Sequence, residues 1–279
     1  MLLRSVTKHL KEQNWFAVFI DFLIVVIGIL IAFQITEWNE KLQQQKTASN
    51  YIERLHEELQ ANIKDLKQRK SYFEQTKLHA LDAHDALNKA PELLGIQFLI
   101  DIYQTSQIIP RDIGRDTYDE ILSVGANDAV TNVNARKRLA NYYRSIKALD
   151  ITLFTVTSYR ELIREGMPYA AQAAIRKSCD DIDSTDPTGT AIISLPESCE
   201  PDMTNEEIAH GISTILKLDI RKPLVRRLSD LDLKITHANL FTWLSTMLLF
   251  HAKDTLVWLT QRAKSRFGIC GSHLRLLNL

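Results

Sequence analysis

The residues that are able to do chemistry in this chain are scattered rather than grouped. Eight histidines and three cysteines are the candidates for metal binding or nucleophilic catalysis. His79 and His84 are five residues apart, so they do not share one helix face, and no zincin-type spacing occurs. The chain has no glycine-rich phosphate loop and no nucleophile elbow. We therefore expect no cofactor, no metal site and no catalytic residue, and that the protein is not an enzyme.

Carboxylates and tyrosines offer weaker candidates. Glu57 and Glu58 are adjacent carboxylates that we place on a polar face of a helix, without a catalytic role. Tyr142, Tyr143 and Tyr159 either line a ligand pocket between helices or pack in the core, and we favour packing.

The segment 178–203 is acidic and irregular, and we interpret it as a loop. Asp181, Asp183 and Asp186 are spaced like calcium ligands. Gly189, however, lies at the wrong position for an EF-hand, so a solvated acidic loop is the preferred interpretation.

Two of the three cysteines bracket this segment. A disulfide between Cys179 and Cys199 would close a loop of about 20 residues, worth on the order of 3 kcal/mol in the chain-entropy model. The alternative is two unrelated reduced thiols. No role is assigned to Cys270. A disulfide would indicate an oxidising compartment.

The element that must position everything else is an apolar run from Trp15 to Ile35. As a helix it spans roughly 30 Å, the thickness of the hydrocarbon core of a bilayer. Its only ionisable residue is Asp21 and its only glycine is Gly28. We predict a transmembrane helix at 15–35 rather than a buried core helix, and an uncleaved anchor because no small-residue cleavage pair follows the run.

Flanking residues predict the orientation of this anchor. Trp15 and Trp38 lie at the distance expected of two membrane-interface anchors. The leader at 1–14 is basic, whereas Glu37 and Glu40 follow the run. The positive-inside rule then places the N-terminus in the cytosol and the rest outside.

One face of the predicted span carries small and polar residues: Ala17, Asp21, Gly28 and Ala32. Gly28 and Ala32 form a small-xxx-small pair, which lets another helix approach closely. We expect this face to pack against a second copy or a partner subunit. The alternative is that Asp21 is simply hydrated at the cytosolic edge of the membrane.

Helical periodicity continues through the chain, which has only nine glycines and seven prolines. We predict an all-α fold, in which the anchor continues into an antiparallel helical bundle at 36–264, followed by a tail at 265–279. The bundle is expected to begin with an apolar stripe at Ile52, Leu55, Leu59, Ile63, Leu66 and Phe73. Further helices are expected at 93–103, 118–124, 134–166, 204–218 and from residue 223 onward. The apolar segment 240–250 is too short for a second span and is assigned to the bundle.

Composition excludes one class of partner. Basic and acidic side chains balance at 34 each, so nothing indicates a nucleic-acid-binding surface.

The anchor resembles an uncharacterised family of single-pass bacterial membrane proteins. The similar residues are Asp21, the run Val25–Ala32 (VVIGILIA), Gln34 and the exit Trp38–Glu40 (WNE). The segments Thr117–Gly125 (TYDEILSVG) and Leu139–Tyr143 are also similar. The resemblance covers about the first 60 residues and 117–143, and the cysteine loop and the C-terminal third depart from it. It implies the architecture and no activity.

The sequence thus predicts a membrane-anchored helical interaction or scaffold protein. We expect an accessory subunit of a bacterial envelope complex, in the inner membrane, with its main domain in the periplasm. Its expected partners are the lipid bilayer and another membrane helix. The alternative is a helical bundle that senses a small molecule outside the cytosol and signals through a partner.

Overall fold

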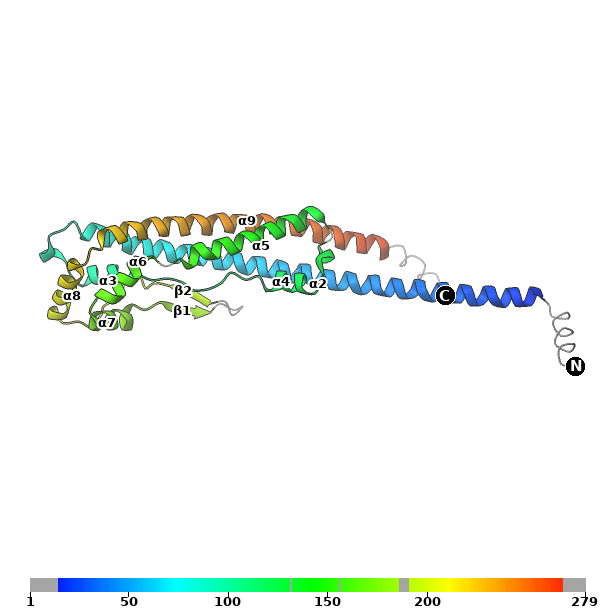
Figure 1. Ribbon diagram of the computed structural model, residues 1–279, viewed down its shortest axis with the longest axis horizontal. Helices are drawn as coiled ribbons and strands as arrows, with labels where there is room; N and C mark the ends of the chain where they lie inside the picture. Colours follow the sequence, from blue (N-terminus) through cyan, green and yellow to red (C-terminus); the bar gives the residue numbers. More distant parts are fainter. Residues whose placement is uncertain (1–14, 131, 156, 186–190, 268–279) are drawn as a thin grey trace, which may run out of the picture. The chain divides into compact units, whose positions relative to one another are not determined.

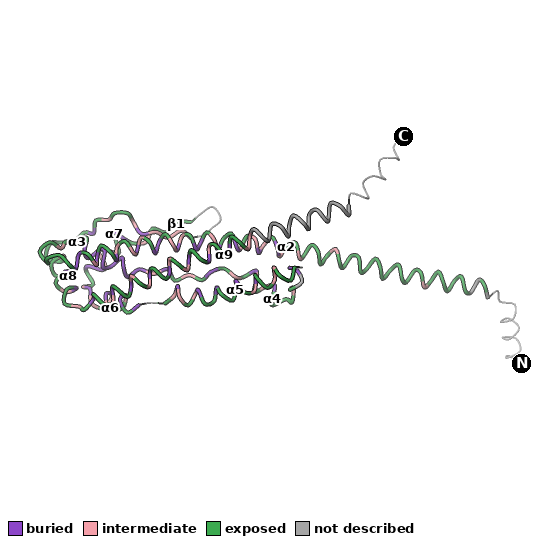
Figure 2. The backbone as a smooth tube through the Cα atoms, turned by 90° about the horizontal axis from the view of Figure 1, so that it is seen from above, coloured by how far each residue is buried: buried purple, intermediate pink, exposed green. Residues whose placement is uncertain are grey.

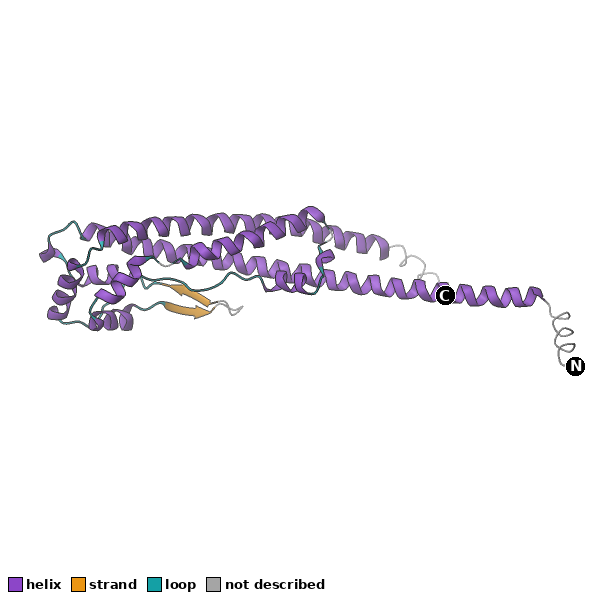
Figure 3. Ribbon diagram, viewed as in Figure 1, coloured by secondary structure: helices purple, strands orange, loops and turns teal. Residues whose placement is uncertain are grey.

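The computed structural model describes residues 15–130, 132–155, 157–185 and 191–267, with only the backbone at 15, 17, 18, 128, 191 and 250–267. The chain is mostly helical (78%), as the sequence predicts (Figure 3). The fold differs from the predicted all-α class, because the described residues include one pair of short strands. The leader at 1–14, Val156, Asp186, Gly189 and Cys270 lie outside the described residues.

The elements follow one another along the chain in this order. They are α2 (Trp15–Ala86), η1 (Pro91–Leu93), α3 (Ile96–Gln104), α4 (Asp116–Ser123), η2 (Asn127–Ala129), α5 (Val133–Phe154), α6 (Ser158–Gly166), α7 (Tyr169–Cys179), β1 (Ile182–Thr185), β2 (Ala191–Ser194), α8 (Asn205–Lys217) and α9 (Arg221–Phe267) (Figure 1).

The chain divides into two compact units, Met1–Tyr51 and Ile52–Leu279. In the first unit, α2 is apolar on nearly every face from Trp15 to Ile35, and it is exposed almost throughout (Figure 2). Its most apolar 18-residue window has a mean hydropathy of 2.5, and none of that window is buried. Among the described residues, α2 is the one helix long and apolar enough to cross a membrane.

In the second unit, the remainder of α2 supplies an apolar stripe to the core. Ile52, Leu55, Leu59, Leu66 and Phe73 are buried, as their three- and four-residue spacing predicts. The sixth member, Ile63, is only half-buried.

The other helices of this unit pack in two groups. Helix α5 packs along α9, and α6 contacts both α9 and α8. Helices α3, α7 and α8 contact one another pairwise. The inner face of α9 buries Leu224, Leu231 and Ala238, which follow one another at intervals of seven residues. The same face also buries two cations that the apolar pattern did not predict, Arg227 and Lys234.

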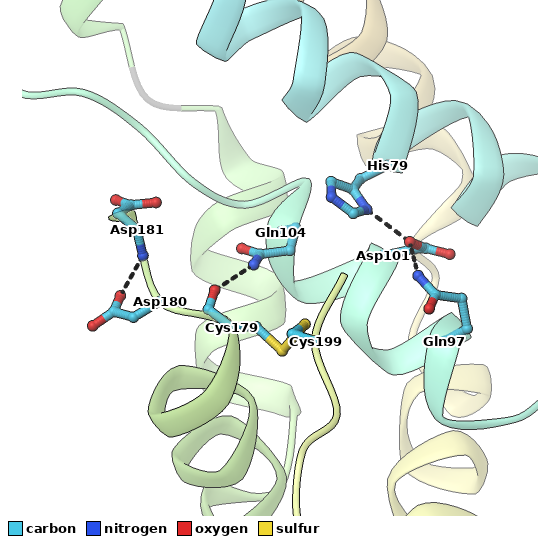
Figure 4. The surroundings of a disulfide bond; sticks show 8 residues. All are labelled: His79, Gln97, Asp101, Gln104, Cys179, Asp180, Asp181 and Cys199. Atoms are coloured by element: carbon cyan, nitrogen blue, oxygen red, sulfur yellow. Dashed lines mark hydrogen bonds and ion pairs between the residues drawn. A yellow bond between two sulfur atoms is a disulfide. The ribbon is translucent and has the colours of Figure 1, made fainter. Parts of the chain in front are cut away.

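The segment assigned to an acidic loop contains a hairpin. Strands β1 and β2 pair antiparallel, with Ile182 opposite Ser194 and Thr185 opposite Ala191. Cys179 and Cys199 are joined by a disulfide, with their Cα atoms 5.3 Å apart, and this is the pair that the sequence singled out (Figure 4). The interpretation of 178–203 as loop was therefore wrong at the hairpin, which the disulfide closes at its base.

An extended strap, residues 105–115, connects α3 to α4. Side chains from three helices donate hydrogen bonds to its backbone carbonyls. Arg227 Nε reaches Thr105 O at 3.0 Å and Arg227 Nη2 reaches Gln107 O at 2.6 Å. The other donors are Arg160 to Ser106 O, Arg69 to the carbonyls of Arg111 and Asp112, and Asn62 to Gly114 O. Because buried carbonyls need donors, these side chains replace the missing secondary structure.

Helix boundaries differ from the predicted ones where tertiary contacts compete with local signals. The expected helix 134–166 is two helices, α5 and α6, and the side chain of Asn132 caps α5. At the break between them, the carbonyl oxygen of Thr155 accepts a hydrogen bond from Lys234 Nζ of α9 at 2.8 Å. In a continuous helix that oxygen would instead accept from a backbone amide of the next turn. The expected helix 204–218 corresponds to α8, which begins with a capping box of Thr204 and Glu207.

Candidate functional site

A connected group of polar and aromatic side chains lies where α2, α4 and α5 meet in the second unit. At its centre is Glu58, whose carboxylate accepts from two directions. Its Oε2 accepts the backbone amide of Thr117 at 2.6 Å, and its Oε1 accepts the hydroxyl of Tyr143. Glu58 is half-buried, whereas its neighbour Glu57 is exposed.

This carboxylate also replaces a predicted helix cap. Thr117 and Glu120 have the spacing of a capping box, but α4 begins at Asp116 and has no side-chain cap from its own N-terminal residue. Glu58 satisfies the first-turn amide of Thr117 from α2 instead, and a negative charge there is favoured by the helix dipole. Glu120 forms an ion pair with Arg54, and both side chains are half-exposed. The distance from Arg54 Nη1 to Glu120 Oε1 is 3.1 Å.

Three tyrosines continue the group toward α9. The ring of Tyr143 stacks on Tyr118, with centroids 4.2 Å apart, and meets Tyr142 edge to face at 5.0 Å. Tyr142 and Ser245 share a hydrogen bond of 2.7 Å. Because Ser245 donates its proton to the carbonyl of Phe241, Tyr142 is the donor in that pair. The group therefore ties four helices together.

Burial decides what these tyrosines can do. Burial, with Glu58 nearby, raises the pKa of Tyr143 far above its ordinary value, and burial also raises the pKa of Tyr142. Both hydroxyls therefore stay protonated at neutral pH and act as hydrogen-bond donors, not as bases. Tyr159 does not belong to this group: its hydroxyl donates to the carbonyl of Ile102 at 2.9 Å.

Glu58 is the first member of a longer row, here called the polar stripe of α2. The row comprises Glu58, Asn62, Asp65, Arg69, Tyr72, Thr76 and His79, in alternating steps of four and three residues. Arg69 is fully buried and bonds Asp65 at 2.6 Å as well as the strap. Tyr72 donates to Asp181 at 2.9 Å, which fastens the start of the hairpin. The signal for this row is heptad spacing of polar residues, which a search for apolar periodicity does not detect.

A second buried ionic group lies on α9. Asp230 accepts from Arg227 at 2.7 Å and from Lys234 at 3.1 Å, and both cations are almost fully buried. Burial lowers the pKa of Lys234 and of Arg227, and Asp230 acts in the opposite direction. The carboxylate is thus the compensating charge for two cations in the core.

Where they are described, the histidines and the acidic segment do not form a metal site. His79 pairs with Asp101 at 2.8 Å, whereas His84 lies by Asp85 at 3.4 Å (Figure 4 shows the former pair). In the part of the chain that is described, no three His, Cys, Asp or Glu side chains come together in a group able to hold a metal ion. Asp181 is engaged by Tyr72, and burial raises the pKa of Asp181.

The predicted packing face of the anchor is accessible. Asp21, Gly28 and Ala32 are exposed on α2, and so is Trp38. A Cβ added at Gly28 would meet no described atom within 4 Å. For Trp15 and Ala17 only the backbone is described, and it is helical.

No protein-family model, curated protein or solved structure matches this chain. The resemblance of its anchor to a family of single-pass bacterial proteins accordingly stays a prediction.

Proposed function

We propose that the protein is a membrane-anchored helical interaction or scaffold protein, an accessory subunit of a complex in a bacterial envelope. One observation carries the proposal. The 18-residue apolar window of α2 has a mean hydropathy of 2.5 and no buried residue. Apolar surface of that extent is unfavourable in water, and a lipid bilayer is the solvent that removes the cost.

The proposed location is the inner membrane, with the N-terminus in the cytosol and the second unit in the periplasm. The basic leader supports this orientation through the positive-inside rule. The disulfide between Cys179 and Cys199 supports a compartment in which thiols are oxidised.

The proposed architecture of the second unit is an antiparallel helical bundle. Two contacts support opposite directions for α2 and α9. Near the start of α9, Arg221 Nη1 donates to Asn88 Oδ1 at 3.0 Å, and further along, Asp232 accepts from Lys77 at 2.6 Å. Residue numbers therefore rise on one helix as they fall on the other.

Interaction is favoured over catalysis because three of the reactive groups in the described residues are already engaged. Glu58 accepts two hydrogen bonds, Asp181 accepts from Tyr72, and His79 is paired with Asp101. By contrast, the small-residue face of the anchor at Gly28 and Ala32 is exposed. Small residues at this spacing are the usual means of close helix contact in membranes.

Fractionation and protease accessibility test the topology. The protein should stay with membranes after alkaline carbonate washing, and protease added to spheroplasts should degrade the second unit. Full protection of that unit would contradict the periplasmic assignment, and release by carbonate would contradict the anchor.

Purification in mild detergent at native abundance tests the interaction. A membrane protein should co-purify in stoichiometric amount. Recovery of the chain alone, together with a small molecule that raises its Tm, would instead favour the sensing function.

A further inference from the structure

The guanidinium groups of three arginines meet at one end of the strap. Arg227 of α9 donates to two of the backbone oxygens there. From α6, Arg160 Nη1 donates to the carbonyl of Ser106 at 2.6 Å. One turn later, Arg164 Nη2 donates to the side-chain oxygen of Gln107 at 3.0 Å. Two helices thus direct three positive charges at adjacent residues of the strap.

Arg160 and Arg164 are the two members of this group that solvent reaches. Both are half-buried, whereas Arg227 is 2% exposed. They are four residues apart on α6, so they lie on the same face of that helix. The guanidinium of Arg164 lies over the buried ring of Tyr103, 3.8 Å from its centroid. Stacking on this ring orients the planar guanidinium, as recognition of an oxyanion by two parallel hydrogen bonds requires.

The two guanidiniums have donors left for a further acceptor. Within the described residues, the oxygens that they bond are uncharged, one a carbonyl and the other an amide oxygen. A guanidinium has five N–H donors. The Nε of Arg164 is buried, so the Nη atoms are the donors that a ligand reaches on that side chain. Oxygens of phosphate and carboxylate groups make the strongest hydrogen bonds to such donors, often two in parallel.

The charges around this end of the strap favour an anion. The carboxylate of Asp230 is already shared between Arg227 and a lysine of the same helix. Burial, and next the charge of Arg164, lower the pKa of Arg160. The protonated guanidinium of Arg160 therefore lies where its charge is disfavoured, and a negatively charged ligand relieves the repulsion between the two arginines.

The acceptor that competes with a ligand is Asp181, at the start of the hairpin. Burial raises the pKa of Asp181, and Arg164 is among the groups that oppose this effect. The carboxylate accepts from the hydroxyl of Tyr72 at 2.9 Å. Asp181 is therefore engaged by another donor while it acts on Arg164 through its charge.

We propose that Arg160 and Arg164 bind a phosphate monoester group, carried by a soluble molecule or by a lipid headgroup. Such a group has three terminal oxygens and close to two negative charges at neutral pH, so it can accept from both guanidiniums at once. A carboxylate has two oxygens and one charge, which a single guanidinium satisfies. All of these residues belong to the second unit, so the inference does not depend on the anchor.

Titration calorimetry of the full-length chain in mild detergent, at constant ionic strength, tests the site. Inorganic phosphate should bind saturably, once per chain, and at least tenfold more tightly than acetate. Arg160→Gln and Arg164→Gln should each weaken binding at least tenfold, whereas Arg144→Gln, at an exposed residue of α5, should leave it unchanged. Equal binding of phosphate and acetate, or equal weakening by all three variants, would overturn the site.

A variant with the opposite sign separates this site from a structural effect. Asp181→Asn removes the competing charge but keeps an oxygen for Tyr72, so it should tighten phosphate binding severalfold. Weaker binding in this variant would contradict the placement of the ligand between Arg164 and the hairpin.

Arginine modification of the unaltered chain gives a test that does not depend on the folding of any variant. Phosphate should slow the reaction of Arg160 and Arg164 with phenylglyoxal at least threefold, followed by mass spectrometry, and leave Arg144 unaffected. Equal rates with and without phosphate would overturn the proposal. Glycerol 3-phosphate and short-chain phosphatidic acid then distinguish the sources: stronger protection by the lipid indicates a headgroup, and stronger protection by glycerol 3-phosphate indicates a soluble ligand.

Discussion

Replacing Glu58 with glutamine tests whether one carboxylate holds α4 and α5 against α2. Glutamine keeps the shape but has a single acceptor oxygen and an amino group that only donates. In one orientation the amide of Thr117 loses its acceptor. In the other, the hydroxyl of Tyr143 must turn from donor to acceptor. Neither orientation restores both of the bonds made by Glu58.

The expected magnitude follows from these two bonds. A hydrogen bond to a charged group contributes about 1.5–3 kcal/mol. Removing a negative charge from the first turn of α4 costs about 0.3–1 kcal/mol more. For a unit of about 230 residues, a total of about 2–4 kcal/mol corresponds to a fall in Tm of roughly 5–15 °C.

Thermal unfolding of the full-length chain in mild detergent, followed by circular dichroism, measures this fall. Glu57→Gln is the matched control, because Glu57 is exposed and its substitution should change stability by less than about 0.5 kcal/mol. Tyr143→Phe and the double variant complete a thermodynamic cycle, whose coupling free energy should be about 1–2 kcal/mol. If Glu58→Gln and Glu57→Gln unfold at the same temperature, the carboxylate does not hold α4.

Three further variants have defined outcomes. Cys199→Ser removes a cross-link worth on the order of 3 kcal/mol, and hydrogen exchange should increase more in β1 and β2 than in α5 and α9. Asp230→Asn should lower the free energy of unfolding by about 3–5 kcal/mol, because it leaves two buried cations uncompensated. Burial lowers the pKa of Lys234, so keeping that residue protonated reduces the free energy of unfolding. Measured by urea unfolding, this loss of stability should become smaller as the pH rises from the lowered pKa toward the ordinary value of 10.5. Gly28→Leu should abolish co-purification of a membrane partner without preventing insertion, whereas Val26→Leu, on another face, should not.

The sequence predicted correctly those elements that depend on residues close together in the chain. The apolar stripe that begins at Ile52 forms the buried side of α2, and the capping box of Thr204 and Glu207 begins α8. Gly125 has a φ of +70°, as its predicted position after a short helix requires. Each of these features depends on residues within one or two turns of one another.

The missed features depend on partners distant in sequence. Asn62 and Arg69 bond backbone carbonyls of the strap, and every residue has a carbonyl, so the strap carries no recognisable pattern. The hairpin was missed because its four-residue strands are short and β1 is exposed at every position, so no alternation marks it. Contacts with Tyr72 and Gln75 of α2 hold it in place.

The strap has a consequence for how the chain can change over time. Six of the hydrogen bonds that hold it end on backbone oxygens. Substitutions at exposed strap positions leave these six bonds intact, whereas substitution of a donor such as Arg227 or Arg69 removes two of them. Gly114 is an exception, because a Cβ there would lie 3.1 Å from Oδ1 of Asn62. Exposed strap positions such as Pro110 and Asp112 tolerate substitution by other amino acids. They are positions at which the molecule can acquire new surface chemistry without altering its fold.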